Sequence, residues 1–299
     1  MPYRPFNRLP PGALVAVVAP AGPADAQRVA AVPALIESQG WRARVYPGCH
    51  QRTGFLAGPD AQRAADLQAA LDDPAVDAIW CLRGGYGSGR LLGRITLPAR
   101  PKLLIGYSDI TALHALLDRA GWLALHAPMP ASDLLLPGHE DDARVLFALL
   151  KQGLPAGTVW APPLATPALR CAGRAQGRLL GGNLSLLAAL CGTPWQPVTD
   201  GRLLFIEDVS ESLYRVDRLL LQLAQAGLLA AAAGFVLGSF TEADDPLPVL
   251  QDHLAHLGKP VLGGWPAGHG TPNRALPMGA LATLDADAGS LRLDQDVLV

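Results

Sequence analysis

Charged and aromatic side chains are both scarce in this 299-residue chain. Asp, Glu, Lys and Arg make up 17% of it, Phe, Trp and Tyr make up 6%, and the net charge is −2. No run of charge reaches five residues, so the basic surface that would bind nucleic acid is not indicated. No apolar run is long enough to cross a bilayer, so we expect no membrane partner. The 50% of hydrophobic residues instead predicts a large folded core.

Motifs that hold metals or nucleotides are also missing. No G-x-G-x-x-G follows the first predicted strand, and neither a Gly-Lys-Ser/Thr loop nor an H-E-x-x-H helix occurs. The cysteines show no C-x-x-C spacing, which argues against a zinc site or a disulfide framework and favours buried free thiols. We therefore expect no cofactor and no metal. The four cysteines are Cys49, Cys81, Cys171 and Cys191.

The first residues have some features of a secretion signal. Arg4 and Arg8 precede an apolar run at 13–19. That run is as short as the apolar part of a signal can be, and prolines at 10–11 interrupt its start. A first core strand explains the run better.

Apolar periodicity predicts strands that alternate with helices in the first half of the chain. This order is typical of a mostly parallel α/β sheet, whose functional loops lie beyond the carboxyl ends of its strands. Asp60 is the expected cap of the second helix. The predicted strands are 13–18, 41–46, 75–82, 102–105 and 123–126, and the predicted helices are 24–39, 58–71, 112–117 and 139–150.

A stretch rich in Pro, Ala and Gly divides the chain. We place a linker at 153–172, between a first domain at 1–152 and a second at 173–299. In the second domain we expect a closing hairpin formed by 281–284 and 291–293. Its other strands are predicted at 177–180, 202–206, 234–240 and 260–262, and its helices at 184–190, 213–226 and 248–257.

Ser108 lies where the strand at 102–105 meets the following helix. A strand that turns sharply into a helix presents the joint residue at the helix N-terminus, where backbone N–H groups are unpaired. Ser108 could attack a carbonyl there, with the N–H of Asp109 holding the oxyanion, as in a nucleophile elbow. Ile110 stands in place of the second glycine of G-x-S-x-G. The alternative is that Ser108 only caps the helix.

A glycine-rich run at 84–89 follows the strand at 75–82. Such backbone can approach a ligand closely and point N–H groups at it. Gly85 is therefore a candidate second oxyanion donor. The alternative is a tight turn without a ligand.

Glu207 and Asp208 end a buried strand, where a carboxylate is well placed to orient a histidine. Glu207 is the first candidate for that role, and Asp208 competes with it. His269, between two glycines after a strand, is the best-placed base, and His126 at a strand end is the alternative. The order Ser108, Glu207, His269 is that of α/β-hydrolase triads.

Together these motifs resemble the LD-carboxypeptidase family, also known as muramoyltetrapeptide carboxypeptidases. The microcin C immunity proteins of that family share the motifs. The resemblance extends from the first strand to 278–279 and rests on five motifs in the same order. They are Arg83-Gly84-Gly85-Tyr86-Gly87, Gly106-Tyr107-Ser108-Asp109-Ile110-Thr111, Gly181-Gly182-Asn183-Leu184-Ser185, Phe205-Ile206-Glu207-Asp208 and Gly268-His269-Gly270.

By motif position, the resemblance implies a catalytic triad of Ser108, Glu207 and His269, with the backbone N–H groups of Gly85 and Asp109 as the oxyanion hole. It implies a serine peptidase that removes the terminal D-alanine from peptidoglycan tetrapeptides. The implied fold is α/β, with a flavodoxin-like parallel sheet, similar to class I glutamine amidotransferases, that has helices on both faces. A smaller β-rich domain follows. Family members are usually homodimers and are typically cytoplasmic.

An exopeptidase must also recognise a free carboxylate, which a guanidinium binds with two parallel hydrogen bonds. Arg83, Arg178 and Arg274 lie near the motifs, and the sequence does not choose among them. Asn183 is a further candidate, or it caps the helix that follows.

Three rival functions stay open. A microcin-immunity-like hydrolase of acyl-sulfamoyl-adenylates needs an aromatic side chain that stacks on adenine, and no aromatic insertion is evident between Glu207 and His269. A binding protein could have kept the fold and lost turnover, although all three triad residues are present. A nucleotide-binding module would bind NAD without hydrolysis. The sequence does not distinguish diaminopimelate from lysine at the third peptide position, or sugar-linked from free tetrapeptide.

Overall fold

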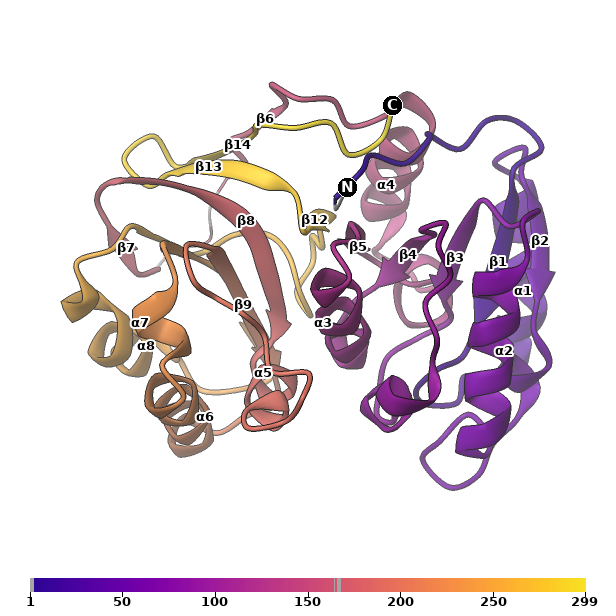
Figure 1. Ribbon diagram of the computed structural model, residues 1–299, viewed down its shortest axis with the longest axis horizontal. Coiled ribbons are helices and arrows are strands. Elements are labelled where there is room, and N and C mark those ends of the chain that lie inside the picture. The colour runs from indigo at the N-terminus through magenta and orange to yellow at the C-terminus, as the bar shows by residue number, and fades with distance from the viewer. Residues whose placement is uncertain (1–2, 164, 166–167) are drawn as a thin grey trace.

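Two β-sheets lie side by side, each with its own helices (Figure 1). The computed structural model describes residues 3–163, 165 and 168–299. The first sheet has the strand order β12-β5-β4-β3-β1-β2, and all its neighbours are parallel except β12 and β5. Its strands are β1 (Leu14–Val18), β2 (Arg42–Val45), β3 (Ala78–Cys81), β4 (Leu103–Gly106), β5 (Ala124–His126) and β12 (Leu276–Met278).

The parallel order 2-1-3-4-5 is that of flavodoxin-like folds, which confirms the predicted α/β class. β1, β3 and β4 are buried along their whole length because helices cover a parallel sheet. This explains why each reads as an unbroken apolar run. The helices of this half are α1 (Ala26–Glu37), α2 (Asp60–Asp72), α3 (Thr111–Arg119) and α4 (Glu140–Gln152).

The second sheet has the strand order β6-β14-β13-β8-β9-β10-β11-β7. Its strands β8 to β11 are parallel, and the remaining neighbours are antiparallel. The predicted closing hairpin is present as β13 and β14. The strands are β6 (Val159–Trp160), β7 (Arg170–Cys171), β8 (Arg174–Asn183), β9 (Leu203–Val209), β10 (Gly234–Thr241), β11 (Val261–Leu262), β13 (Leu281–Asp285) and β14 (Ser290–Leu293).

Alternate side chains of β9 join different cores, as the two-residue period of a strand requires. Leu203 and Phe205 belong to a core shared with the first sheet, whereas Leu204 and Ile206 pack with the helices of the second half. The second sheet therefore lies between these helices and the first half of the chain. The helices are α5 (Leu184–Leu190), α6 (Leu213–Gln225), α7 (Leu228–Ala231) and α8 (Leu247–Leu254).

The connections between the two halves differ from the sequence prediction in part. β6 falls inside the predicted linker at 153–172 and pairs with β14, while residues 164, 166 and 167 of that linker lie outside the described residues. β12 leaves the second half and pairs with β5 of the first sheet. The predicted domain boundaries at 152 and 173 stay a prediction.

One local prediction was wrong. Asp60 is the first residue of α2 and not its cap, which is Pro59 without a side-chain hydrogen bond. The carboxylate of Asp60 instead pairs with Arg63 and Arg90.

A close contact joins the halves beside the nucleophile candidate. Gly182 has a φ of +141°, and a Cβ there would lie 2.3 Å from Oγ1 of Thr111. The absent side chain lets the end of β8 reach the first turn of α3. There the backbone N–H of Asn183 donates to Oγ1 of Thr111 at 3.0 Å.

No helix in the described part of the chain combines the length and hydropathy that crossing a membrane requires.

Candidate active site

Ser108 lies in the sharp turn between β4 and α3. It begins a single 3₁₀ turn, η3 (Ser108–Ile110), and its φ is +64°. A residue other than glycine adopts this left-handed conformation only where the surrounding structure enforces it. Tyr107 caps η3 and Ile110 caps α3, so Ser108 is the cap of neither helix. This strained strand-to-helix turn has the geometry expected of a nucleophile elbow.

Ser108, His269 and Glu207 form one hydrogen-bonded chain. The Ser108 hydroxyl lies 3.0 Å from Nε2 of His269, and Nδ1 of His269 lies 2.6 Å from Oε2 of Glu207. Glu207 is fully buried on β9, the side chain of His269 is 16% exposed, and Ser108 is half-buried. The fold thus links a buried carboxylate to an accessible hydroxyl through an imidazole.

The electrostatics of the chain favour a charged imidazole. Burial alone would lower the pKa of His269, but the hydrogen bond and the negative charge of Glu207 outweigh it, so the pKa lies above 6.5. Burial raises the pKa of Glu207, and the hydrogen bond from His269 opposes that rise. A carboxylate on Nδ1 fixes the tautomer in which neutral His269 presents an acceptor at Nε2. Such an imidazole can take the proton of Ser108.

Asp208, the competitor of Glu207, has other partners. Its carboxylate accepts hydrogen bonds from Nδ2 of Asn183 at 2.8 Å and from the backbone N–H and hydroxyl of Ser185 at 3.0 and 2.9 Å. Asn183 in turn caps α5 by accepting from the N–H of Leu186 at 3.2 Å. Asp208 and Asn183 are therefore engaged at the start of α5, away from the imidazole.

His126, the alternative base, is fully buried at the end of β5. Neither of its ring nitrogens has a hydrogen-bond partner among the described residues, and the same holds for the buried His114 of α3. Burial, reinforced by the neighbouring His114 and His269, lowers the pKa of His126 well below 6.5. The structure brings His269, and not His126, to the Ser108 hydroxyl.

The glycine run lies directly against Ser108. A Cβ on Gly84 would lie 2.8 Å from Oγ of Ser108 and 3.5 Å from the backbone nitrogen of Asp109. The next residue, Gly85, has a φ of +106°, which favours glycine. Its N–H donates no hydrogen bond in the described part of the chain. The N–H of Asp109 lies in the first turn of η3, where no helical carbonyl precedes it.

The side chain of Asp109 links these two loops. Its buried carboxylate accepts from the backbone N–H of Ser88 at 2.7 Å, while the Ser88 hydroxyl donates to the carbonyl of Asp109 at 2.5 Å. Arg63, also buried, donates to the carbonyl of Gly87 at 2.9 Å. The glycine run and the Ser108 turn are thereby held in one arrangement. The motif pointed to the backbone of Asp109, but nothing in the sequence indicated the roles of Arg63 and Ser88.

The candidate arginines differ in what already binds them. Arg274 pairs with Asp141 and Asp142, and Arg178 donates to Gln295 and to a backbone carbonyl. Arg83 donates through Nη1 to a backbone carbonyl at 3.0 Å, and its buried Nε has no partner among the described residues. Its Nη2 lies 3.9 Å from where a Cβ on Gly85 would be, so this guanidinium lies beside the glycine run.

Tyr107 is a neighbour that sequence reasoning missed. Its ring packs against the imidazole of His269, with 4.9 Å between ring centroids, and its hydroxyl donates to Oδ1 of Asp133 at 2.7 Å. Burial raises the pKa of Tyr107 well above 10, and the charge of Asp133 adds to the rise. Its position before the serine was the only available signal.

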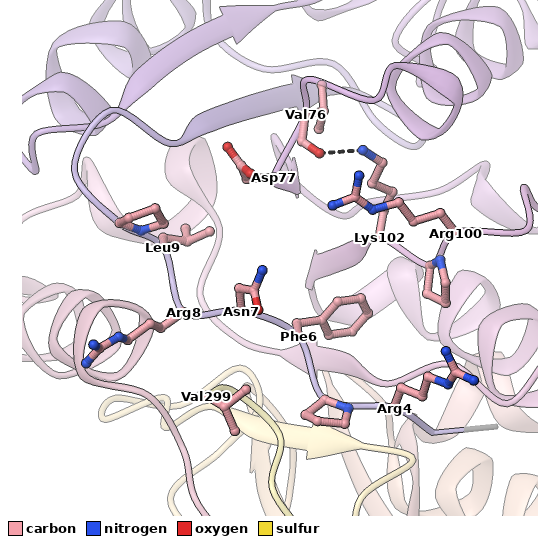
Figure 2. Close-up of a pocket in the computed structure, with 13 residues that line it drawn as sticks. Arg4, Phe6, Asn7, Arg8, Leu9, Val76, Asp77, Arg100, Lys102 and Val299 are labelled. Atoms are coloured by element: carbon pink, nitrogen blue, oxygen red, sulfur yellow. Dashed lines mark hydrogen bonds between the residues drawn. The ribbon is translucent and has the colours of Figure 1, made fainter. Parts of the chain in front are cut away.

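A concave surface lies at the edge of the first sheet where β3 and β4 begin, opposite the edge from which the chain enters Ser108 (Figure 2). It encloses about 460 Å³, and Arg4, Arg8, Arg100 and Lys102 contribute its positive charge. The Lys102 ammonium is engaged by the carbonyl of Val76 at 2.5 Å. Ser108 follows the carboxyl end of β4, so this pocket is separate from it.

One surface cluster in the described part of the chain has the composition of a metal site, namely Asp217, Asp252 and His253. Both aspartates are exposed, and the imidazole of His253 contacts Oδ1 of Asp217 at 2.7 Å. It shares no residue with the Ser108 site.

Two family descriptions match this chain. Residues 15–127 match the LD-carboxypeptidase N-terminal domain, and residues 176–284 match the LD-carboxypeptidase C-terminal domain. The chain belongs to the LD-carboxypeptidase family. It is therefore a serine-type peptidase, which confirms the predicted enzyme class.

Individual relatives agree with this assignment. The murein tetrapeptide carboxypeptidase of Pseudomonas aeruginosa is 34% identical over 292 residues, which cover 91% of this chain and 93% of that protein. A crystal structure of muramoyltetrapeptide carboxypeptidase from Oxalobacter formigenes is 30% identical, with a TM-score of 0.84 and coverage of 96% and 100%. A structure of MccF in complex with glutamyl sulfamoyl guanosine has a TM-score of 0.89 and covers 98% and 99%, but at 22% identity it shares the fold alone.

Proposed function

We propose that this family member removes the terminal D-alanine from peptidoglycan-derived muramoyl tetrapeptides, using Ser108, His269 and Glu207 as a catalytic triad. The observation that carries the proposal is the hydrogen-bonded chain from the buried Glu207 through His269 to the strained Ser108. The names of the murein tetrapeptide carboxypeptidase relatives support the choice of substrate.

Acylation begins when Nε2 of His269 takes the proton of the Ser108 hydroxyl. Ser108 Oγ then attacks the carbonyl of the L-centred residue that precedes D-alanine. The backbone N–H groups of Gly85 and Asp109 hold the resulting oxyanion, and Glu207 stabilises the imidazolium. Collapse of the tetrahedral intermediate breaks the peptide C–N bond, and the D-alanine amine leaves with the proton from His269.

Deacylation repeats the steps with water in place of the serine. His269 takes a proton from water, the hydroxide attacks the acyl ester, and the same two N–H groups hold the second oxyanion. When the ester bond breaks, Ser108 recovers its proton from His269. The products are D-alanine and a tripeptide with a new carboxylate.

Arg83 is our candidate for binding the carboxylate of the terminal D-alanine. Its guanidinium lies beside Gly85, and its Nε is buried without a partner in the described structure. A guanidinium can bind a carboxylate with two parallel hydrogen bonds. The salt bridges of Arg274 and the contacts of Asn183 leave those side chains less able to bind substrate.

The first experiment is D-alanine release from a purified muramoyl tetrapeptide by wild type and Ser108→Ala. We expect release by wild type only, because the variant lacks the nucleophile. Equal release by both proteins would remove Ser108 from the chemistry. A folded wild type that releases nothing would favour an acyl-sulfamoyl-adenylate substrate or a binding role, and a processed microcin analogue would be assayed next.

We also propose that the enzyme acts in the cytoplasm on recycled murein peptides and works as a homodimer. The motif resemblance supports both proposals, since members of the family that it indicates are typically cytoplasmic and usually homodimers. Light scattering of the purified protein tests the dimer, and a mass close to the 31.3 kDa of one chain would contradict it.

A further inference from the structure

The segment that carries His269 crosses from one sheet to the other. It leaves the second sheet at the end of β11 and enters the first sheet at the start of β12. Ser108 belongs to the first half of the chain, whereas Glu207 and His269 belong to the second. The hydrogen bond between His269 and Ser108 therefore depends on how this crossing segment is held.

Within the second half, neighbouring residues anchor the crossing segment on both sides of His269. The N–H of Gly270 donates to Oγ of Ser239 at 2.9 Å, and the N–H of Gly268 donates to Oδ1 of Asn273 at 3.0 Å. Gly268 has a φ of +108°, and a Cβ there would lie 2.7 Å from Oε2 of Glu207. Asn273 thus fixes the backbone immediately before the imidazole.

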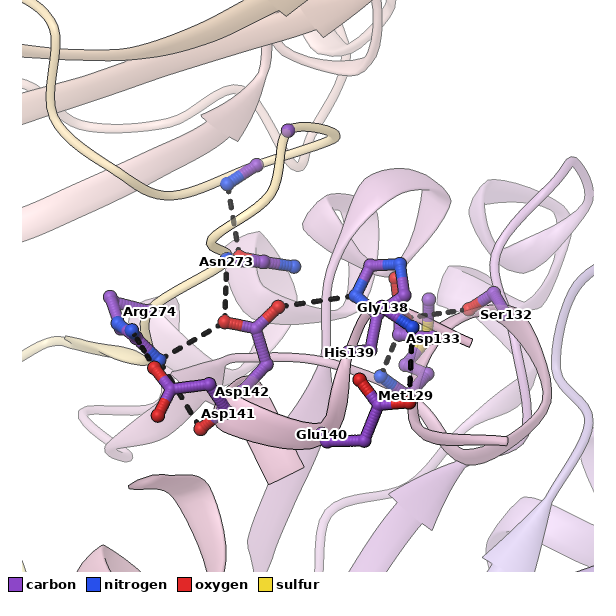
Figure 3. A network of polar contacts seen from close by, with 12 residues as sticks. Met129, Ser132, Asp133, Gly138, His139, Glu140, Asp141, Asp142, Asn273 and Arg274 are labelled. Atoms are coloured by element: carbon purple, nitrogen blue, oxygen red, sulfur yellow. Dashed lines mark hydrogen bonds and ion pairs between the residues drawn. The ribbon is translucent and has the colours of Figure 1, made fainter. Parts of the chain in front are cut away.

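Asp142 ties Asn273 to the first half of the chain. It lies in the first turn of α4, is 2% exposed, and accepts through Oδ1 from the backbone N–H of Asn273 at 3.0 Å. The same oxygen accepts from Nη1 of Arg274 at 3.1 Å, and Oδ2 lies 3.1 Å from Nδ1 of His139. Figure 3 shows Asp142 with His139 on one side and the two residues of the crossing segment on the other.

We propose that Asp142 is a positioning residue which, through Asn273 and Gly268, holds His269 in line with Ser108. Resting on the proposed triad, this assigns a contribution to catalysis to a carboxylate that touches neither substrate nor the reacting atoms. It also explains why an acid that could sit in water at a helix N-terminus is buried beneath the crossing segment.

The contact has the properties that such a role needs. Breaking a buried hydrogen bond leaves its donor without a partner, so an acceptor oxygen at this position resists movement of the segment. A misplacement of the catalytic base by about 1 Å can cost on the order of 10²-fold in rate. Loss of Asp142 should therefore reduce the rate of proton transfer from Ser108 more than it reduces substrate binding.

The test compares Asp142→Ala with Asp142→Asn. Asn keeps an oxygen that accepts from Asn273, whereas Ala removes it. Asp141→Ala is the matched control, because Asp141 precedes Asp142 in the same helical turn and pairs with the same Arg274 but is exposed and does not contact Asn273. Two rates are measured in each protein: D-alanine release, and labelling of Ser108 by a fluorophosphonate, which requires no knowledge of the substrate.

We expect Asp142→Ala to lower kcat and the labelling rate by about 100-fold with KM within about twofold of wild type. In Asp142→Asn both rates should lie within about threefold of the wild-type rates, and in Asp141→Ala both should equal them. Wild-type rates in Asp142→Ala, or equal losses in the Ala and Asn variants, would overturn the proposal.

Two further controls distinguish a failure of the Asp142 proposal from misfolding of the variant and from a wrong substrate. If Asp142→Ala does not fold, Asn273→Ala is used instead: it keeps the backbone N–H that Asp142 binds but removes the Oδ1 that accepts from Gly268, the next link toward His269. It should show the same loss, and normal labelling there would also overturn the proposal. A wild type that is labelled at Ser108 but releases no D-alanine would contradict the proposed substrate, while the labelling rates would still test Asp142.

Discussion

Replacing Glu207 by Gln tests the acid of the proposed triad, because it exchanges one carboxylate oxygen for an amide nitrogen and leaves the shape of the side chain unchanged. Oε2 of Glu207 lies 2.6 Å from Nδ1 of His269, and the side chain is fully buried. An amide N–H turned toward Nδ1 makes that nitrogen the acceptor, so the proton moves to Nε2. His269 then has no lone pair for the Ser108 proton. The matching change in a serine-protease triad lowers kcat about 10⁴-fold, which corresponds to about 5.5 kcal/mol.

Glutamine should leave the fold intact. It fills the volume of glutamate, and Oε1 of Glu207 has no hydrogen-bond partner in the described part of the chain that the change could break. D-alanine release, followed with a D-amino-acid oxidase, gives kcat, and thermal unfolding reports stability. We expect a loss of about 10⁴-fold in kcat with little change in Tm.

Asp208→Asn is the control, because Asp208 is the adjacent buried carboxylate on the same strand. Its partners are Asn183 and Ser185 at the start of α5, so its loss should lower Tm while kcat stays within about threefold. A Glu207→Gln enzyme within tenfold of wild type would refute the tautomer argument. A dead Asp208→Asn enzyme beside an active Glu207→Gln would exchange the two roles.

Three further predictions follow from contacts around the site. Gly84→Ala should lower kcat about 100-fold at nearly unchanged KM, because its Cβ would lie 2.8 Å from Oγ of Ser108. Arg83→Ala should raise KM for the tetrapeptide about 10- to 100-fold, the loss expected for a charge-assisted pair, and Arg178→Gln should leave KM unchanged. His114→Leu should make the protein less sensitive to acid. Burial lowers the pKa of His114 to about 3, so below pH 6.5 the unfolded chain takes up a proton that the folded protein refuses. This contribution of His114 costs wild type about 1.4 kcal/mol of stability per pH unit between pH 6.5 and 4.5, and the variant is spared it, whereas the similar contribution of buried His126 is present in both proteins.

Each of these has an outcome that would contradict it. Steady-state kinetics of Gly84→Ala with unchanged kcat would mean that Ser108 moves aside without harm. A kcat effect without a KM effect in Arg83→Ala would place the guanidinium in the transition state and not in substrate binding. Urea titrations at pH 6.5 and 4.5 give the free energy of unfolding. If it falls equally for wild type and His114→Leu, the folded protein protonates His114 as readily as the unfolded chain does.

The sequence was informative where structure depends on local pattern. β1, β3 and β4 were predicted because a buried parallel strand is an unbroken apolar run. β12 was missed because it has three residues including Pro277, and only its pairing with β5, about 150 residues earlier, makes it a strand. Asp60 fits the composition of a cap, but Arg63 and Arg90 compete for its carboxylate, and no local rule weighs that competition.

The candidate site divides in the same way. Ser108 and His269 could be singled out because each follows a strand, and Glu207 because it lies near the carboxyl end of one, at the edge where an α/β sheet places its functional loops. The contacts that position these three side chains could not be predicted from the sequence. Asp142 and Asn273 are 131 positions apart, and an aspartate three residues into a helix is adequately explained by the helix dipole. Only the contact between the two halves of the chain indicates the positioning role that we propose for Asp142, because a proposed triad divided between those halves needs contacts that keep them aligned.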